Sequence, residues 1–286
     1  MKKYYYLCRN YFWKMGNPVK RVLFVNSEIM PFLPETPISK IGRYLPQGIQ
    51  ECKKEIRAFM PRYGCINDRK NQLHEVIRLS GMNIIVGDVD RPLVIKVASI
   101  AAARIQVYFI DNDDFFRRKQ ICFDADGKFF EDNAQRAIFF ARGMLETVKK
   151  LRWAPDVIHC QGWITNLIPL YLKKAYSSDP IFAESKVVTS LYNEIPDEKF
   201  GPSLKDSILF GNIKPEDIDL SENADGTELA KLAARYSDGI IFGDSDLKPE
   251  IADFCKGLNI PTLAFNQESR DNGNYVKEYD EFYQQL

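Results

Sequence analysis

The chain has 286 residues, of which 45% are hydrophobic and 27% charged, so its composition is that of a globular protein and excludes a disordered one. Lysine plus arginine and aspartate plus glutamate number 39 each, and this zero net charge argues against nucleic acid as a partner. The six cysteines form no Cys-x-x-Cys pair and only two histidines are present, which excludes zinc-ribbon, thioredoxin-type and histidine-rich metal sites. We therefore expect neither a metal ion nor a cofactor.

The first 17 residues lack the pattern of a folded element. Two lysines precede a short apolar run, which Arg9 and Asn10 interrupt before it reaches the length of a signal peptide. No stretch approaches the 18 apolar residues of a membrane span, and scattered thiols suit a reducing cytosol. We interpret residues 1–17 as a disordered extension or a misassigned start, with Met15 as the alternative first residue. We expect a cytoplasmic protein with no membrane partner.

From residue 18 onward the sequence alternates between strand and helix patterns. Residues 21–26 read RVLFVN, a continuous apolar run typical of a strand that is buried on both faces of a parallel sheet. An apolar stripe predicts a helix over 39–54, with Ser39 as its cap. Residues 55–60 form the next apolar run, so the chain opens with a βαβ unit.

Residues 73–110 have a different character, with β-rich pieces, short links and no helical period. They predict an inserted hairpin or meander. Beyond residue 130 the alternation resumes. The expected helices are 131–152, 164–176, 229–236, 248–256 and 275–285, and the expected strands are 156–160, 186–191, 239–242 and 260–265.

This order of elements predicts the α/β class. We expect a single doubly wound Rossmann-like domain over residues 18–266, with a mostly parallel sheet and the β-hairpin or meander insertion. The polar stretch 267–274 is the one shift in composition. We interpret residues 267–286 as a tether followed by a C-terminal helix.

Ligands of open α/β sheets bind outside the carboxyl ends of the strands, so the loops after the strands are the candidate sites. The usual phosphate-binding signatures, Gly-x-Gly-x-x-Gly and Walker A, are absent. The first such loop contains Pro34 and Pro37, which have no N–H to offer a phosphate. A rigid connector is favoured there over a specificity loop.

Four further residues have both a structural and a functional interpretation. His159 lies in a buried apolar strand without an evident carboxylate partner, so a hydrogen-bonded core histidine is favoured over a catalytic one. Trp163 either shapes a pocket or packs in the core, and the two are equally supported. Asp244 and Asp246 follow a strand, where acids cap the next helix more often than they bind a metal.

Several ordered segments are similar to the N-terminal catalytic region of bacterial glycogen synthases and plant starch synthases. The resemblance covers about residues 20–255. It is carried by RVLFVNSEIMPF at 21–32, MPRYG at 60–64, QVYFIDNDDFF at 106–116, EDNAQRAIFFAR at 131–142, PDVIHCQGW at 155–163, LIPLYLK at 167–173 and LAARYSDGIIFGDSDLKPEI at 232–251. These enzymes are retaining glucosyltransferases with the GT-B fold, so the resemblance implies that this sequence forms half of such a fold.

The sequence departs from the family at its chemical motifs. The Lys-x-Gly-Gly-Leu loop, which contacts the nucleotide diphosphate, falls on 34–38, where Pro34 replaces the lysine. The family's His-Ala-His-Asp-Trp corresponds to 159–163, with Gly162 in place of the acid. Its Thr-Ile-His-Asn corresponds to 189–192, with Leu191 in place of the histidine. The family's second Rossmann-like domain has no counterpart in this sequence.

The resemblance implies transfer of glucose from ADP-glucose or UDP-glucose to an α-1,4-glucan. The departures imply that the isolated chain is inactive or incomplete, and that a partner glycosyltransferase chain completes it. The alternative is a non-catalytic relative that binds glucan, sugar nucleotide or a partner enzyme. Whether the chain is an enzyme therefore stays open, and no catalytic residue is assigned. The strand-end rule and the family's sugar-contacting loops together predict ligand binding by Glu35, Asn112, Gln161, Trp163, Tyr192 and Asn193.

Overall fold

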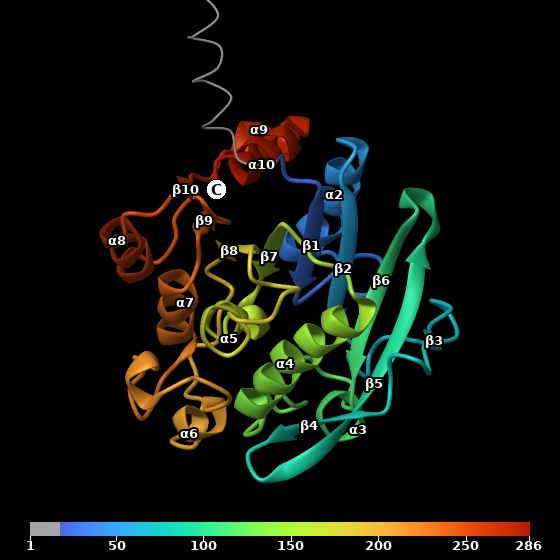
Figure 1. Ribbon diagram of the computed structural model, residues 1–286, viewed down its shortest axis with the longest axis vertical. Coiled ribbons are helices and arrows are strands. Elements are labelled where there is room, and N and C mark those ends of the chain that lie inside the picture. The colour runs from blue at the N-terminus through green and yellow to red at the C-terminus, as the bar shows by residue number, and fades with distance from the viewer. Residues whose placement is uncertain (1–17) are drawn as a thin grey trace, which may run out of the picture.

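The computed structural model describes residues 18–286, and the expectations for residues 1–17 lie outside the described part. A ten-stranded mixed sheet forms its centre (Figure 1). The parallel strands have the order β10 (Thr262–Leu263), β9 (Gly239–Phe242), β8 (Lys186–Leu191), β7 (Val157–Gln161), β1 (Arg21–Asn26), β2 (Glu55–Pro61) and β6 (Ile105–Asp111). The expected α/β class with a mostly parallel sheet is confirmed.

The central strands consist of apolar runs because both of their faces are covered. Residues 22–25 of β1 are fully buried, and β1 pairs in parallel with β2 on one side and β7 on the other. Phe24 lies opposite Ala58 and His159 in this register. The five strands expected at 21–26, 55–60, 156–160, 186–191 and 239–242 are all present, with ends that differ by one residue at most.

The expected β insertion is also present. Strands β3 (His74–Glu75) and β4 (Met82–Val86) both pair antiparallel with the long strand β5 (Val89–Ile100), which in turn pairs antiparallel with β6. The insertion therefore extends the sheet beyond β6 and leaves the parallel part intact.

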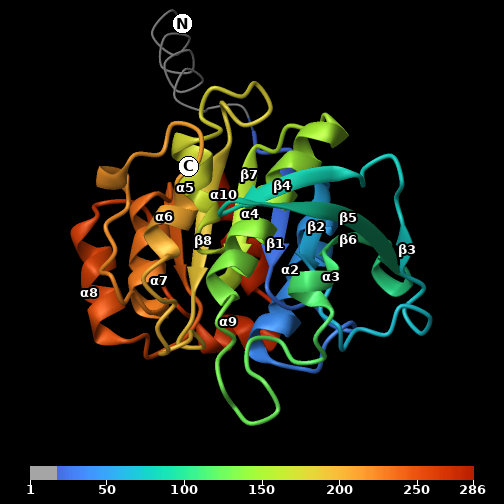
Figure 2. The same ribbon diagram turned by 90° about the horizontal axis from the view of Figure 1, so that it is seen from below.

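Helices cover the two faces of the sheet unequally. One face carries α4 (Asn133–Leu151), α5 (Ile168–Lys174), α7 (Gly226–Arg235) and α8 (Pro249–Gly257), which pack against one another in that order. The other face carries α2 (Pro37–Glu51) and α10 (Tyr275–Gln284), which lie behind the sheet in Figure 2. Right-handed crossovers explain this arrangement. The connections β1 to β2 and β2 to β6 run in one direction across the sheet and the later ones run in the other, and of the first two only β1 to β2 contains a long helix. Helix α10 fills the rest of that face.

The N-terminus of α2 differs from the expectation. The helix begins at Pro37 with Thr36 as its N-cap, and Ser39 is the third helical residue instead of the cap. The Thr36 hydroxyl accepts from the Ser39 backbone N–H at 3.0 Å, and the Ser39 hydroxyl accepts from the Thr36 N–H at 2.8 Å. This reciprocal pair is a capping box, and proline is favoured at the first helical position.

Two other helical segments differ from the expectation. The helix expected over 164–176 is divided into a 3-10 turn at Trp163–Thr165 and helix α5, whose second residue is Pro169; proline is favoured in the first turn of a helix. The stretch expected to be a tether contains helix α9 (Gln267–Asn272), whose N-cap Asn266 accepts from the Ser269 N–H. Shorter helices α3 (Asp113–Phe116) and α6 (Leu204–Ile208) complete the fold.

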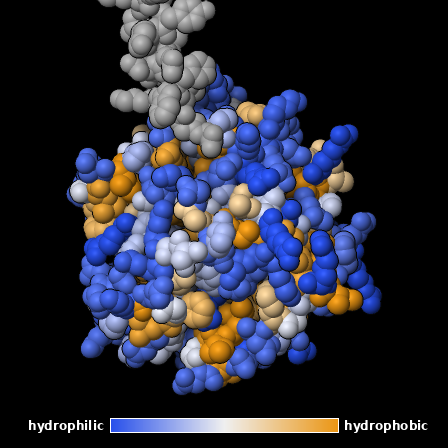
Figure 3. Space-filling model, viewed as in Figure 1, coloured by the Kyte–Doolittle hydropathy of each residue, from blue (hydrophilic) through white to orange (hydrophobic). Residues whose placement is uncertain are grey.

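The surface is mostly hydrophilic, with an apolar area over the β4–β5 hairpin at the lower edge of the view (Figure 3). Ile85 and Val89 of that hairpin are about half exposed. Within residues 18–286, none of the helices has both the length and the apolar character that crossing a bilayer requires.

Candidate functional site

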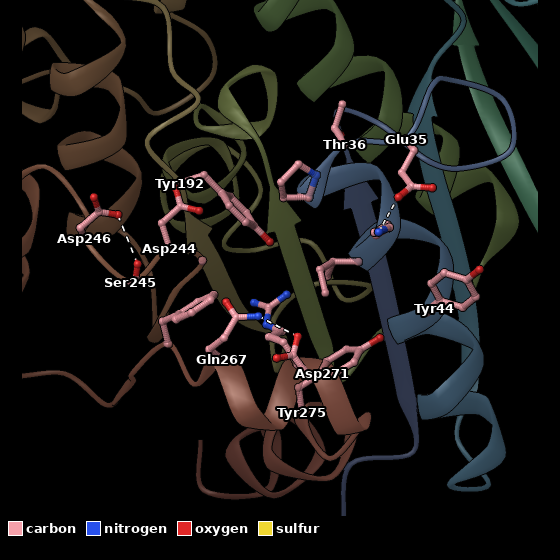
Figure 4. Close-up of a pocket in the computed structure, with 16 residues that line it drawn as sticks. Glu35, Thr36, Tyr44, Tyr192, Asp244, Ser245, Asp246, Gln267, Asp271 and Tyr275 are labelled. Carbon is pink, nitrogen blue, oxygen red and sulfur yellow. Dashed lines mark hydrogen bonds and ion pairs between the residues drawn. The ribbon is translucent and has the colours of Figure 1, made fainter.

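A cavity of about 550 Å³ opens at the carboxyl ends of the strands, and we call it the α9 cavity. The start of α2 forms one side, the loops after β8 and β9 form the second, and α9 with the start of α10 forms the third (Figure 4). Its lining residues are Glu35, Thr36, Pro37, Lys40, Ile41, Tyr44, Tyr192, Gly243, Asp244, Ser245, Asp246, Phe265, Gln267, Arg270, Asp271 and Tyr275.

The α2 side of the cavity is rigid and already satisfied in its hydrogen bonding. The Thr36 hydroxyl caps the helix and also donates to Glu28 at 2.6 Å. Glu35 forms an ion pair with Lys40, and a hydrogen bond from Lys40 to Glu35 raises the pKa of the Lys40 ammonium. The loop thus forms a hydrogen-bonded wall of the cavity.

Tyr192, directly after β8, is held in a fixed position. Its ring lies on Gly243, where an added Cβ atom would approach ring carbon Cε1 to 2.3 Å. Its hydroxyl donates to Gln161 Oε1 at 3.2 Å, and Gln161 Nε2 donates to Asn26 Oδ1 at 2.8 Å. Gln161 is completely buried, so it supports Tyr192 from below and is absent from the cavity wall.

Asn193 connects the loops that follow β8 and β9. Its backbone N–H donates to Asp244 Oδ2 at 2.6 Å, and its side-chain amide donates to the carbonyl of Asp246 at 2.9 Å. The Asn193 side-chain oxygen accepts from the Lys248 N–H at the start of α8. The expectation that Asp244 or Asp246 caps α8 is wrong, because Lys248 is the N-cap residue of α8 and no side chain caps this helix. No group of three metal-ligating side chains occurs within residues 18–286.

Arg270 of α9 is a site residue that the sequence reasoning missed. Its Nη2 donates to the hydroxyl of Tyr279 at 2.7 Å, and its guanidinium lies over the rings of Phe265, Tyr275 and Tyr279. Burial acts to lower the pKa of Arg270, but the neighbouring Tyr279 and Tyr192 outweigh it and raise that pKa, so the side chain remains a cation. The arginine therefore adds one fixed positive charge to the cavity wall.

A second cavity of about 410 Å³ lies beside the first, over the end of β1. Trp163 lines it, packed against Phe129 and Phe200 at ring distances of 6.3 and 5.7 Å, so this residue both packs and shapes a pocket. Carboxylates also line it, and burial followed by repulsion from Glu28 raises the pKa of Glu194.

Asn112 lies apart from these two cavities. It caps α3 by accepting from the Asp114 and Phe115 N–H groups, and its amide donates to the Pro92 carbonyl at 2.9 Å. It lines a third cavity, of about 270 Å³, beside the ion-paired Lys96 and Asp111.

The structure thus brings together only some of the residues named from the sequence. Glu35 and Tyr192 line the α9 cavity, Gln161 supports it and Asn193 holds its loops, whereas Trp163 and Asn112 line other cavities. All six lie at or next to the carboxyl ends of strands.

His159 plays no part in these cavities. It is completely buried, with Nε2 bonded to the Ser190 hydroxyl at 2.7 Å and Nδ1 bonded to the Tyr283 hydroxyl at 2.8 Å. Burial, together with the charge of Arg270, lowers its pKa to about 3. The interpretation of His159 as a core histidine is confirmed.

Comparison with known proteins agrees with this architecture. Residues 21–260 match the starch synthase catalytic domain family. The glycogen synthase of Chlorobium limicola is 33% identical over 221 residues, which cover 76% of this chain and 44% of that protein. The glycogen synthase of Pelodictyon phaeoclathratiforme is 38% identical over 174 residues, which cover 60% of this chain and 36% of that protein.

In three dimensions the chain is similar to the catalytic domain of starch synthase IV from Arabidopsis thaliana bound to ADP and acarbose. The TM-score is 0.67 at 14% identity, covering 89% of this chain and 53% of the other. This chain thus spans about half the length of the proteins it matches, or less. Since the matched segment runs from β1 through α8, the chain belongs to the starch synthase catalytic domain family and has the Rossmann-like architecture of a GT-B glycosyltransferase domain.

Proposed function

We propose that this chain binds α-glucan in the α9 cavity and does not transfer glucose on its own. The observation that carries the proposal is the charge of the cavity wall. Of its two cations, Lys40 is already paired with Glu35. The remaining charged side chains are Asp244, Asp246, Asp271 and Arg270, so negative charge is in excess.

A negative wall disfavours a nucleoside diphosphate. Diphosphate sites use several cations or the free N–H groups of a helix N-terminus, which supply charge-assisted hydrogen bonds. Here the N-terminus of α2 is capped by the Thr36 hydroxyl, and Pro37 has no N–H. The neighbouring cavity offers no better site, because Glu28, Glu194 and other carboxylates line it without a lysine or arginine among its lining residues.

The same wall suits a neutral sugar. Each sugar hydroxyl both donates and accepts, so carboxylates and a guanidinium can be satisfied by one ring. The apolar C–H faces of a glucosyl ring pack against aromatic side chains, which dominate many small-molecule pockets. The aromatic residues of the α9 cavity are Tyr44, Tyr192, Phe265 and Tyr275.

The backbone at Gly162 also argues against catalysis by the family's motif. The residue has φ +86°, and an added Cβ atom would lie 2.0 Å from the Ser27 hydroxyl oxygen. An acidic side chain therefore does not fit at this position without a shift of the loop after β1. The packing of Ser27 against Gly162 thus favours glycine over an acidic residue at this position.

A second candidate function is glucose transfer completed by another polypeptide. It is favoured by the names of the relatives, which are glycogen synthases, and by the ADP bound to the structural neighbour. In that case the sugar nucleotide would contact mainly the second polypeptide, because the α9 cavity offers a diphosphate little compensating charge.

Isothermal titration with maltoheptaose, ADP-glucose and UDP-glucose tests the proposal, together with incorporation of radiolabelled glucose into glycogen by the purified chain. We expect maltoheptaose to bind more tightly than either sugar nucleotide, and we expect no incorporation above background. Tighter binding of a sugar nucleotide, or turnover of about 1 per second or more, would show that the proposal is wrong.

A further inference from the structure

The guanidinium of Arg270 lines the α9 cavity and contacts two tyrosine side chains, Tyr279 and Tyr192. Its Nη2 donates to Tyr279, and within residues 18–286 it forms no ion pair with a carboxylate. Three aromatic rings surround the charge instead, with centroids 5.4 to 5.5 Å from the guanidinium carbon. Because a guanidinium has five N–H donors in a fixed plane, contacts with two tyrosine hydroxyls still leave donors for a ligand.

We propose that Arg270 determines the specificity of the α9 cavity by donating hydrogen bonds to the hydroxyl and ring oxygens of one glucosyl unit. This inference rests on the proposed glucan binding. The three rings hold the guanidinium in place before the ligand arrives, so little side-chain entropy is lost on binding. The carboxylates across the cavity accept from the hydroxyls that Arg270 does not reach.

Arg270 lies outside the segment that matches the family. Helix α9 begins at Gln267, beyond the family match at 21–260. In Figure 4, Gln267, Asp271 and Tyr275 lie at the lower side of the cavity, below Thr36 and Glu35. The cavity thus combines a wall from the family's own segment with a wall from a segment outside it. Ligand binding should therefore depend on residues that the family match does not contain.

The test compares three variants by titration with maltoheptaose, with the melting temperature of each variant as a record of folding. Arg270→Met removes all donors but keeps an unbranched side chain, and Arg270→Lys keeps the charge but loses the planar fork. Lys277→Met is the matched control, because it removes a cation from the exposed Lys277–Glu281 pair on α10, away from the cavity. Inorganic pyrophosphate is titrated in parallel.

We expect Arg270→Met to weaken maltoheptaose binding by roughly 10- to 100-fold, the usual effect of losing hydrogen bonds from a charged group. Arg270→Lys should lie between Arg270→Met and the wild type, and Lys277→Met should match the wild type. A lower melting temperature with unchanged maltoheptaose affinity in Arg270→Met would assign Arg270 a purely structural role and overturn the inference while glucan binding stands. Arg270-dependent binding of pyrophosphate, tighter than that of maltoheptaose, would also overturn it. A wild-type chain that binds no maltoheptaose would refute both proposals.

Discussion

Nδ1 of His159 in β7 and the hydroxyl oxygen of Tyr283 in α10 lie 2.8 Å apart in a buried hydrogen bond that joins positions 124 residues apart. The other ring nitrogen bonds to Ser190 in β8. The C-terminal helix is therefore connected through its buried face to the middle of the sheet, at the point where a polar side chain interrupts an apolar strand.

Removing the Tyr283 hydroxyl should destabilise the fold. Tyr283→Phe leaves a buried imidazole nitrogen without a partner, which costs about 1–3 kcal/mol. Urea unfolding followed by circular dichroism measures the loss in the free energy of unfolding. Tyr44→Phe is the control, because that side chain is 49% exposed and its hydroxyl forms no hydrogen bond within residues 18–286. Equal stability of the two variants would contradict the role assigned to Tyr283.

His159 should make stability depend on pH below neutrality. Its pKa is lowered to about 3 in the folded state by burial and, less strongly, by Arg270, whereas an unfolded histidine titrates near 6.5. Below about pH 6.5 the unfolded chain therefore binds a proton that the folded chain excludes. This contribution to stability is complete above pH 6.5 and is lost as the pH falls towards 3, by up to about 1.4 kcal/mol per pH unit.

The measurement is the free energy of unfolding of the wild type and of His159→Gln between pH 4.5 and 7.5. The difference between them should shrink as the pH falls, because glutamine does not titrate. His74→Gln at an exposed position serves as the control and should give a curve parallel to the wild type. A parallel curve for His159→Gln as well would show that His159 does not titrate in this way.

Replacing Gly243 should change the shape of the α9 cavity, because the Tyr192 ring packs against it. Gly243→Ala places a methyl group against the Tyr192 ring, so the ring or the loop after β9 must shift. We expect a stability loss of about 1–3 kcal/mol from overpacking and weaker binding of maltoheptaose. Gly257→Ala, in helix α8, is the matched control because no atom lies within 4 Å of the added carbon. Unchanged maltoheptaose affinity in Gly243→Ala would show that Tyr192 does not contribute to the binding site.

Deleting residues 267–286 should abolish cooperative unfolding. Tyr279, Phe282 and Tyr283 are nearly completely buried on the side of the sheet that α2 covers only in part. The deletion exposes the apolar surface against which these three side chains pack. The truncated chain should bind the dye ANS and lose a sharp melting transition, because a large apolar surface meets water. A truncated chain that melts like the full chain would support the interpretation of residues 267–286 as a loosely attached tether and helix.

Buried parallel strands were the most predictable part of this molecule. A run such as RVLFVN has only one common environment, between two layers of helices, so its strand assignment needs no further information. Helix ends were less predictable, because Thr36 and Ser39 are equally good caps in sequence and only their reciprocal hydrogen bonds decide between them. The division of the 164–176 helix likewise depends on local geometry around Pro169.

The candidate site was predictable only where it follows strand ends. Glu35 and Tyr192 come from loops that the carboxyl-end rule selects, whereas Arg270 lies in a short polar helix that no such rule covers. Its position depends on contacts with Phe265, which precedes α9, and with Tyr275 and Tyr279 of α10. The spacing of Tyr275, Tyr279 and Phe282 was the available signal, since it marks an apolar face of α10 that had to pack somewhere.

The late position of α10 in the sequence has a consequence for synthesis. Leu191, the last residue of β8, leaves the ribosome 84 positions before Tyr275, the first residue of α10. At roughly 5–20 residues per second, the sheet face that α10 covers stays open for several seconds in every nascent chain. During that interval β7 and β8 present an uncovered apolar surface, so efficient production of this protein in a cell should depend on chaperones that shield such surfaces until α10 is synthesised.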